Sequence, residues 1–304
     1  MDGSIRYLKN REIDKRLWDQ CITNSTNGLI YAHSYYLDIM CSNWDALVLN
    51  DYEAVMPLPW RKKWGINYIY QPAFVAQLGV FGKLITADVV VLFLKAIPTK
   101  FKYIDCPLNH QNLFSINLSG IFRRHNNILD LSHPYQILNN NYRETIRRNI
   151  KKAKSYGCTL VRDFPVDDVL GLALQQSVQS GIEQDGFRRF GNLYSELSKK
   201  KRARTYGVLS SAGQLIASCV FSFSHNRAYY ILVGNHPDGR SLGASHLLID
   251  SFIQDYAQSN LLLDFEGSDA RNLAFFYSSF GAVAEDYAAI KLNRLPLLIR
   301  WLKD

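Results

Sequence analysis

The alternation of helix and strand patterns along the chain is the feature that most limits its possible fold. In the first half, the spacing of apolar residues predicts helices at 11–21, 34–41 and 86–97, and strands at 44–50, 53–60, 67–72 and 102–108. An Asn-rich turn follows at 139–141. Interleaved helices and strands are typical of α/β folds, because each sheet then has helices available to cover its faces.

After the turn the alternation starts again. The second half is predicted to contain helices at 142–156, 166–180, 190–201, 242–257 and 269–279, strands at 204–210, 214–224, 227–234, 260–266 and 283–292, and a short C-terminal helix. The sequence therefore predicts an α/β fold with mixed sheets, divided into two domains of similar order at 1–140 and 141–304.

Composition narrows the class of protein. Apolar residues make up 47% of the 304 residues, which predicts a packed core rather than a disordered chain. The net charge of +8 suits either an anionic ligand or a plain solvated surface. The five cysteines are widely separated and show no metal-ligand or redox spacing, which favours a reducing cytoplasm and no metal site.

No segment has the pattern of a membrane span. The first residues lack the apolar core of a secretory signal. The longest apolar run, at 87–98, contains Asp88 and Lys95, and it is shorter than the ~20 residues that a bilayer requires. We therefore expect a cytoplasmic protein with no integral membrane segment, whose membrane contacts, if it makes any, are peripheral.

The stretch DGRSLGAS at 238–245 lies between a predicted strand and a predicted helix. Gly239 and Gly243 permit backbone conformations that side chains forbid, and the small residues Ala244 and Ser245 let a ligand approach the main chain. The free N–H groups at a helix start attract anions. The alternative is a plain helix start capped by Ser241 or Ser245.

A basic segment, NYRETIRRNIKKAKSYG at 141–157, is predicted to form an amphipathic helix. Ile146, Ile150 and Ala153 form its apolar stripe. The cations on the other faces either bind an anionic partner or form a solvated surface.

Asp264 and Glu266 alternate with apolar residues at the end of a predicted strand. Period 2 places both carboxylates on one face of the sheet. A carboxylate at such an edge can act as a base or orient an amine, and it can equally cap the helix that follows.

Together these segments resemble the Fem-type acyltransferases, which contain two tandem domains of the GNAT fold and include the aminoacyl-tRNA-dependent enzymes that build peptidoglycan cross-bridges. The resemblance rests on GRSLGAS, LDFEGS and FGA within 232–282, on the basic helix, and on VMPLPWRKKWGINYIYQPAFVAQLGVFG at 55–82. It implies a mixed α/β fold with a GNAT-like domain in each half, the second of which carries the donor loop.

The resemblance also implies a donor site. In the GNAT pattern of Gln or Arg, two residues, Gly, one residue, then Gly or Ala, this chain has Arg240, Gly243 and Ser245, so a serine occupies the last small position. No tightly bound cofactor is implied, and the donor is acyl-CoA or aminoacyl-tRNA. The residues expected to hold it are Gly239, Arg240, Gly243, Ala244 and Ser245.

The implied reaction is attack of an amine on an activated acyl group. Glu266 is the first choice for the base and Asp264 the second. Tyr230 or Tyr277 would protonate the leaving group, although aromatic residues at such positions are more often part of the core. Arg147, Arg148 and Lys151 would attract an anionic substrate, such as a phosphate-bearing or lipid-linked cell-wall precursor or the end of a tRNA.

The rival hypothesis is a non-catalytic protein of the same fold whose basic helix binds nucleic acid or another polyanion. The sequence contains no RNA or DNA motif, and no aromatic residues interleave with the basic run as stacking platforms would require. Binding of generic RNA that weakens steeply with salt, without acyl transfer, would favour the rival.

Overall fold

The computed structural model describes residues 4–114, 118–177, 184–266, 270–296 and 300. Within this part the chain divides into two units, Met1–Arg124 with Asp286–Asp304 (unit 1) and His125–Glu285 (unit 2). The division differs from the domain boundary at 140/141 predicted from the sequence, because the C-terminal strand belongs in part to unit 1. The predicted helix residues 178–180 and 269, and most of the predicted C-terminal helix, lie outside the described residues.

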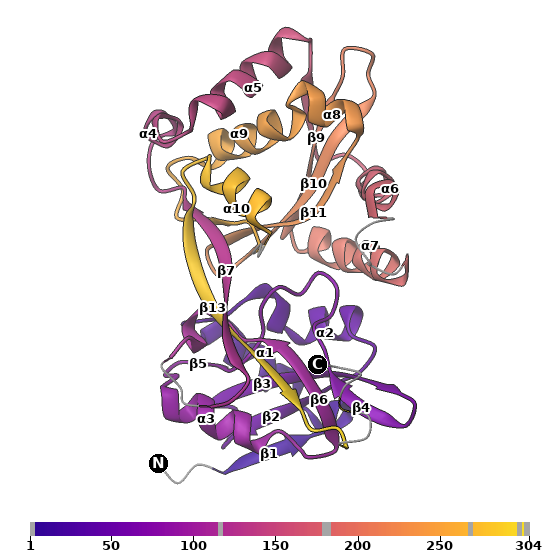
Figure 1. Ribbon diagram of the computed structural model, residues 1–304, viewed down its shortest axis with the longest axis vertical. Helices are drawn as coiled ribbons and strands as arrows, with labels where there is room; N and C mark the ends of the chain where they lie inside the picture. Colours follow the sequence, from indigo (N-terminus) through magenta and orange to yellow (C-terminus); the bar gives the residue numbers. More distant parts are fainter. Residues whose placement is uncertain (1–3, 115–117, 178–183, 267–269, 297–299, 301–304) are drawn as a thin grey trace. The chain divides into compact units, whose positions relative to one another are not determined.

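Unit 1 is built on a mixed sheet (Figure 1). Its strands are β1 (Ile5–Leu8), β2 (Trp44–Leu49), β3 (Ala54–Lys63), β4 (Ile66–Ile69), β5 (Phe81–Gly82) and β6 (Phe101–Pro107), joined by part of β13 (Val283–Asn293). Its helices are α1 (Lys15–Asn24), α2 (Ser34–Met40) and α3 (Ala87–Ala96). The Thr86 side chain caps α3 by accepting a hydrogen bond from the Val89 N–H.

The strands of unit 2 form a mixed part of the sheet with helices on both of its faces (Figure 1). Its strands are part of β7 (Ile121–Asp130), β8 (Thr159–Arg162), β9 (Ala203–Leu209), β10 (Leu215–Ser224), β11 (Arg227–Asn235) and β12 (Leu262–Asp264). Its helices are α4 (Tyr135–Asn140), α5 (Glu144–Ser155), α6 (Val166–Ser177), α7 (Gln184–Lys199), α8 (Pro237–Leu242), α9 (Ala244–Tyr256) and α10 (Arg271–Ser278).

The strands of each unit follow the same pairing pattern within one 13-stranded mixed sheet, which confirms the predicted α/β fold. In unit 1 the order β1-β2-β3-β4-β6-β13 contains one parallel pair, β4 with β6. In unit 2 the order β8-β9-β10-β11-β12-β7 contains one parallel pair at the same place, β11 with β12. The last strand of each order comes from a distant part of the sequence, so local patterns could not assign it.

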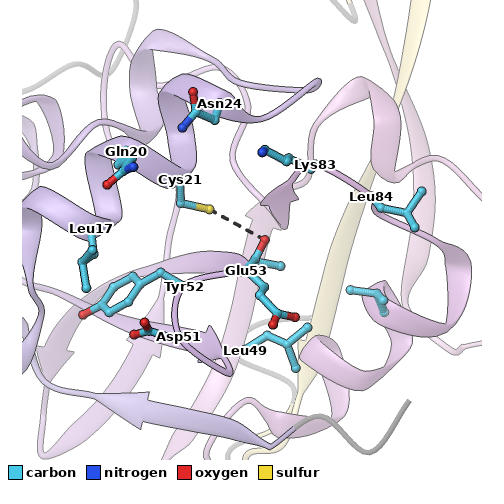
Figure 2. A pocket seen from close by; sticks show the side chains of 12 residues that line it. Leu17, Gln20, Cys21, Asn24, Leu49, Asp51, Tyr52, Glu53, Lys83 and Leu84 are labelled. Atoms are coloured by element: carbon cyan, nitrogen blue, oxygen red, sulfur yellow. Dashed lines mark hydrogen bonds between the residues drawn. The ribbon is translucent and has the colours of Figure 1, made fainter.

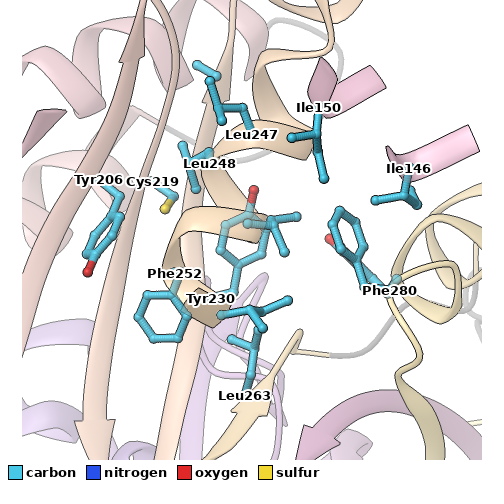
Figure 3. Close-up of a cluster of buried hydrophobic side chains, with 14 of the residues drawn as sticks. Ile146, Ile150, Tyr206, Cys219, Tyr230, Leu247, Leu248, Phe252, Leu263 and Phe280 are labelled. Atoms are coloured by element: carbon cyan, nitrogen blue, oxygen red, sulfur yellow. The ribbon is translucent and has the colours of Figure 1, made fainter. Parts of the chain in front are cut away.

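The core of unit 2 lies between its sheet and α9, with α5 packed on the outside of α9 (Figure 3). Phe252 of α9 stacks on Phe221 of β10 with ring centroids 3.6 Å apart. Ile146, Ile150 and Ala153 are the buried residues of α5, so its predicted apolar stripe is confirmed. Helix α6 covers the other face of the sheet, where a Cβ on Gly234 would come within 2.7 Å of the Ala173 nitrogen.

A buried ion-pair cluster holds the strands of unit 2 together at the paired end of β11. The Arg227 guanidinium donates to the carboxylates of Asp264 at 2.8 Å and Glu285 at 2.5 Å. The Asn126 amide donates to the same two carboxylates. Burial alone would lower the pKa of Arg227, but the hydrogen bonds and charges of Glu285 and Asp264 raise it overall.

Replacing Arg227 tests this cluster. We expect Arg227→Met to lower the free energy of unfolding by about 3–5 kcal/mol, because it leaves two buried carboxylates without their cation. The control is Arg123→Met, which removes the exposed pair with Asp286 and is expected to cost less than about 1 kcal/mol. The measurement is urea denaturation of both variants. Equal, small losses would contradict the assignment.

Candidate functional site

Strands β11 and β12 are paired for only part of their length. Their parallel register joins Arg227 to Leu262 and continues to Tyr229 and Asp264, where β12 ends. Strand β11 continues to Asn235, paired with β10 alone in the described part of the chain. Backbone groups along the open edge need other partners, so the divergence creates a place where an extended ligand can add hydrogen bonds.

A pocket of about 490 Å³ lies at this divergence. Its walls come from α6, β11, α8, α9 and α10. Of the residues expected to act in donor binding or catalysis, it brings together Tyr230, Tyr277, Gly239, Arg240 and Ser245.

The predicted donor loop is not an open loop. Gly239 lies inside the short helix α8, Gly243 ends that helix with a left-handed φ of 79°, and α9 begins at Ala244. A Cβ on Gly239 would lie 2.0 Å from the Ile216 carbonyl oxygen, and one on Gly243 would lie 2.7 Å from that of Asn149. Close packing therefore requires both glycines, and Gly243 also adopts a backbone conformation that side chains disfavour.

The two serines do not cap α9. The Ser241 hydroxyl donates to the Asp238 carbonyl at 2.9 Å, and the Ser245 hydroxyl donates to the Asn235 side chain. The α9 N-cap, Gly243, has no side chain to accept a bond. The N–H groups of Ala244 and Ser245 have no acceptor among the described residues, so the start of α9 keeps unpaired donors for an anion.

Arg240 is the cation at this pocket. Its side chain is exposed and makes no hydrogen bond or ion pair to any residue that the structure describes. It also lines an adjoining pocket of about 370 Å³, which shares Gln176 and Asn235 with the first. The side-chain amide oxygen of Gln176 accepts a hydrogen bond from the Asn235 main-chain N–H at 2.9 Å and fixes the end of β11. An anionic group in either pocket would meet the guanidinium.

Tyr230 and Tyr277 supply two phenols to the pocket. Their rings meet edge to face with centroids 6.3 Å apart. Burial raises the pKa of both hydroxyls, and the charge of Glu266 raises that of Tyr277 further. Neither hydroxyl makes a hydrogen bond to a described residue, so each is a protonated donor that remains available to a ligand.

The two predicted bases lie in different surroundings. Asp264 is buried, and its oxygens accept from Arg227, Asn126 and the Glu266 N–H. These bonds favour a structural role for Asp264 over proton transfer. Glu266 is half-buried beyond the end of β12 and has a left-handed φ of 63°. The predicted alternation on one sheet face is therefore wrong for Glu266, because the strand ends at Asp264.

The basic helix α5 contacts α8 through Lys152, a residue that the sequence analysis did not select. The Lys152 ammonium donates to the Ser241 carbonyl at 2.9 Å. Arg147 is partly buried and donates to the main-chain carbonyls of Asn140 and Tyr142, which favours a structural role. Arg148 and Lys151 are exposed and make no hydrogen bond or ion pair to a described residue, so they stay available for an anionic partner.

His246 lines the pocket and was missed by the sequence reasoning. Its Nε2 lies 3.1 Å from the Asn149 amide of α5, and its Nδ1 is buried without a hydrogen-bond partner among the described residues. Burial lowers the pKa of His246 to about 4, against a smaller opposing effect of the Gly243 carbonyl. The sequence feature that could have identified His246 is its position one residue after the predicted donor loop. A lone histidine in an apolar helix, however, more often belongs to the core.

A second pocket, also of about 490 Å³, lies in unit 1 (Figure 2). Carboxylates of Asp51 and Glu53, the amide of Gln20 and the ammonium of Lys83 line it together with apolar side chains. Burial raises the pKa of the Cys21 thiol at its wall to about 11, so this cysteine is not an activated nucleophile. None of the predicted site residues lies here.

No group of three or more His, Cys, Asp or Glu side chains in the described ranges is arranged to hold a metal ion. No helix in the described ranges is long and apolar enough to cross a membrane.

The buried His246 predicts a pH dependence of stability. In the unfolded chain an imidazole with a pKa near 6.5 takes up a proton as the pH falls, whereas the folded protein resists protonation until about pH 4. The free energy of unfolding should therefore decrease as the pH is lowered from about 6.5 to about 4. We expect His246→Gln to show a smaller fall than the parent protein in urea titrations across this range. Identical slopes for both proteins would contradict the assignment.

The chain was compared with known proteins. Residues 140–271 match the family model described as acetyltransferase (GNAT) domain. No curated protein sequence matches the chain. Solved structures with a similar fold include FemX, at 13% identity and a TM-score of 0.65 over 100% of both chains. A tandem GNAT protein from the clavulanic acid biosynthesis pathway matches at 11% identity and a TM-score of 0.56, over 97% of this chain and 99% of that chain.

A third similar structure is the C-terminal domain of a protein provisionally assigned as a lysylphosphatidylglycerol synthetase from Agrobacterium fabrum, at 12% identity and a TM-score of 0.55, covering 96% of this chain and 95% of that chain. At these identities the similarity establishes the fold. These matches agree with the resemblance seen in the sequence: residues 140–271 match a GNAT domain, and the chain has the fold of FemX and of a tandem GNAT protein.

Proposed function

We propose that this protein is an N-acyltransferase that moves an acyl or aminoacyl group from an activated donor to an amine. The observation that carries the proposal is the pocket at the divergence of β11 and β12. It combines an unpartnered arginine, the free N–H groups of a helix start and two protonated phenols. The pocket thus has anion-binding groups at one end and proton donors at the other. This arrangement suits a long donor molecule that carries phosphates and has a reactive acyl end.

The donor's phosphates would lie at Arg240 and the start of α9. A 13-residue helix presents a positive N-terminal end, and a guanidinium adds a charge-assisted hydrogen bond. An acyl-CoA suits this arrangement, because its extended arm can pair with the open edge of β11. An aminoacyl-tRNA is the other donor class, and its terminal phosphates would use the same groups.

The chemistry needs one bond formed and one broken. A deprotonated acceptor amine attacks the donor's carbonyl carbon, a C–N bond forms, and the bond from that carbon to the donor's sulfur or oxygen breaks. The leaving group takes a proton, which Tyr277 or Tyr230 can donate because burial keeps both phenols protonated. The proton lost by the ammonium form of the acceptor passes through a base to solvent.

Glu266 remains our candidate for that base. In support, its charge contributes to the raised pKa of Tyr277, whose phenol lines the pocket. Asp264 is the weaker candidate, because its oxygens already accept three hydrogen bonds from protein groups. Proton transfer from the amine to Glu266 would run through water, since Glu266 is not part of the pocket wall.

The acceptor is proposed to be an anionic or lipid-linked molecule of cell-envelope metabolism that carries an amine. Arg148 and Lys151 support this, since both are exposed and without a partner in the described chain. Exposed cations on neighbouring turns raise the local concentration of anions. Arg147 is left out of this role, because main-chain carbonyls already occupy its guanidinium.

The test is a panel of acyl-CoA and aminoacyl-tRNA donors, with transfer detected by mass spectrometry. We expect Arg240→Ala to weaken donor binding about tenfold or more, because a hydrogen bond to a charged group is lost. Tyr277→Phe is expected to lower kcat with little change in KM. Arg16→Ala, an exposed arginine of unit 1, serves as the control and should change neither quantity.

The contrary outcome is equally specific. If no donor of the panel binds or reacts, while generic RNA binds with strong salt dependence, the protein is a non-catalytic polyanion binder and the proposal is wrong.

A further inference from the structure

The hairpin of β3 and β4 ends in a two-residue turn. Lys63 pairs with Ile66, so Trp64 and Gly65 alone connect the strands. Both have positive φ, 50° for Trp64 and 79° for Gly65, which is the backbone of a type I′ turn. Figure 1 shows this turn projecting from unit 1.

Trp64 is unfavourable for the fold itself. The left-handed region is uncommon for residues other than glycine, and the first position of such a turn normally takes Asn or Asp. The side chain is also 81% exposed, so it gains almost nothing from burial. The strained backbone and the solvated indole both make Trp64 unfavourable for folding stability. We infer that this tryptophan serves an interaction with another molecule.

The charge around the turn has one sign. Arg61, Lys62 and Lys63 precede Trp64, and the sequence from 54 to 87 contains no aspartate or glutamate. Tyr68 and Tyr70 follow on the partner side of the hairpin, with Arg61 above the Tyr70 ring at 4.5 Å. Basic side chains around a projecting aromatic ring are complementary to an anionic surface that has an apolar layer beneath it.

We propose that the β3–β4 hairpin tip docks on an anionic lipid surface, with Trp64 at the level of the headgroups and the three cations on lipid phosphates. An indole combines a large apolar body with one N–H donor, which suits the boundary between water and hydrocarbon. Each basic residue near an anionic membrane strengthens binding about fivefold. The hairpin lies in unit 1, so this proposal stands independently of acyl transfer in unit 2.

Nucleic acid fits the tip less well. Bases stack on the open faces of aromatic rings, but Lys63 lies above the Trp64 ring at 4.7 Å and Arg61 covers Tyr70. Each of these two rings therefore has a cation over one of the faces on which a base could stack. A lipid surface requires only that the ring edge enters the interface while the cations stay at its phosphates.

Trp64→Asn is the decisive variant, because it replaces the tryptophan by a residue that the turn prefers. We expect its melting temperature to equal or exceed that of the parent protein, while its affinity falls about tenfold or more as the buried ring is lost. The probes are vesicles of phosphatidylcholine mixed with phosphatidylglycerol, vesicles of phosphatidylcholine alone, and generic RNA. Co-sedimentation measures binding to the vesicles.

Charge is tested separately. Lys62→Gln with Lys63→Gln should weaken binding to the anionic vesicles about 25-fold, the product of two fivefold effects. The matched controls are Leu84→Asn, which removes another exposed apolar side chain of unit 1, and Lys83→Gln with Lys95→Gln, which removes two charges elsewhere. Both controls should bind as the parent does.

The proposal is overturned if the parent protein does not bind the anionic vesicles, or if it binds phosphatidylcholine alone equally well. It is also overturned if Trp64→Asn keeps full affinity, or if the tip variants lose binding to RNA and not to vesicles.

Discussion

The candidate site depends on one constraint, the limited pairing of β11 with β12. The Arg227 cluster holds the strands together at one end, and beyond Tyr229 only β10 pairs with β11 among the residues that the structure describes. A strand edge inside a folded protein leaves backbone groups that need partners. Because α9 and α10 supply the other walls, the unpaired edge becomes a pocket rather than an exposed surface. The Arg227 cluster therefore fixes the point beyond which the edge of β11 stays open for a ligand.

The repeated strand pattern does not give the two units the same chemistry. In unit 2 the pocket presents Arg240 and the unpaired N–H groups that start α9. In unit 1 the pocket presents two carboxylates, Asp51 and Glu53, together with Lys83. Phosphate groups are attracted to the first charge distribution and repelled by carboxylates in the second. This difference is the physical reason for assigning the donor to unit 2.

The features that the sequence could predict are those set by local periodicity. The apolar stripe of α5 follows from residues three and four apart, and the strands from 203 to 235 follow from apolar runs between turns. Features set by distant partners could not be predicted. Arg147 is occupied by main-chain carbonyls, Asp264 by Arg227, and His246 meets Asn149 of another helix. Glu266 leaves the strand through a left-handed backbone that period 2 does not reveal.

The most direct test of the account is a crystal structure of the protein with coenzyme A. The account predicts that phosphate groups lie against Arg240 and the N–H groups of Ala244 and Ser245, and that the thiol end points to Tyr230 and Tyr277 between β11 and β12. Ordered coenzyme A in the unit 1 pocket of Asp51, Glu53 and Lys83, or an empty β11–β12 divergence at saturating ligand, would contradict it.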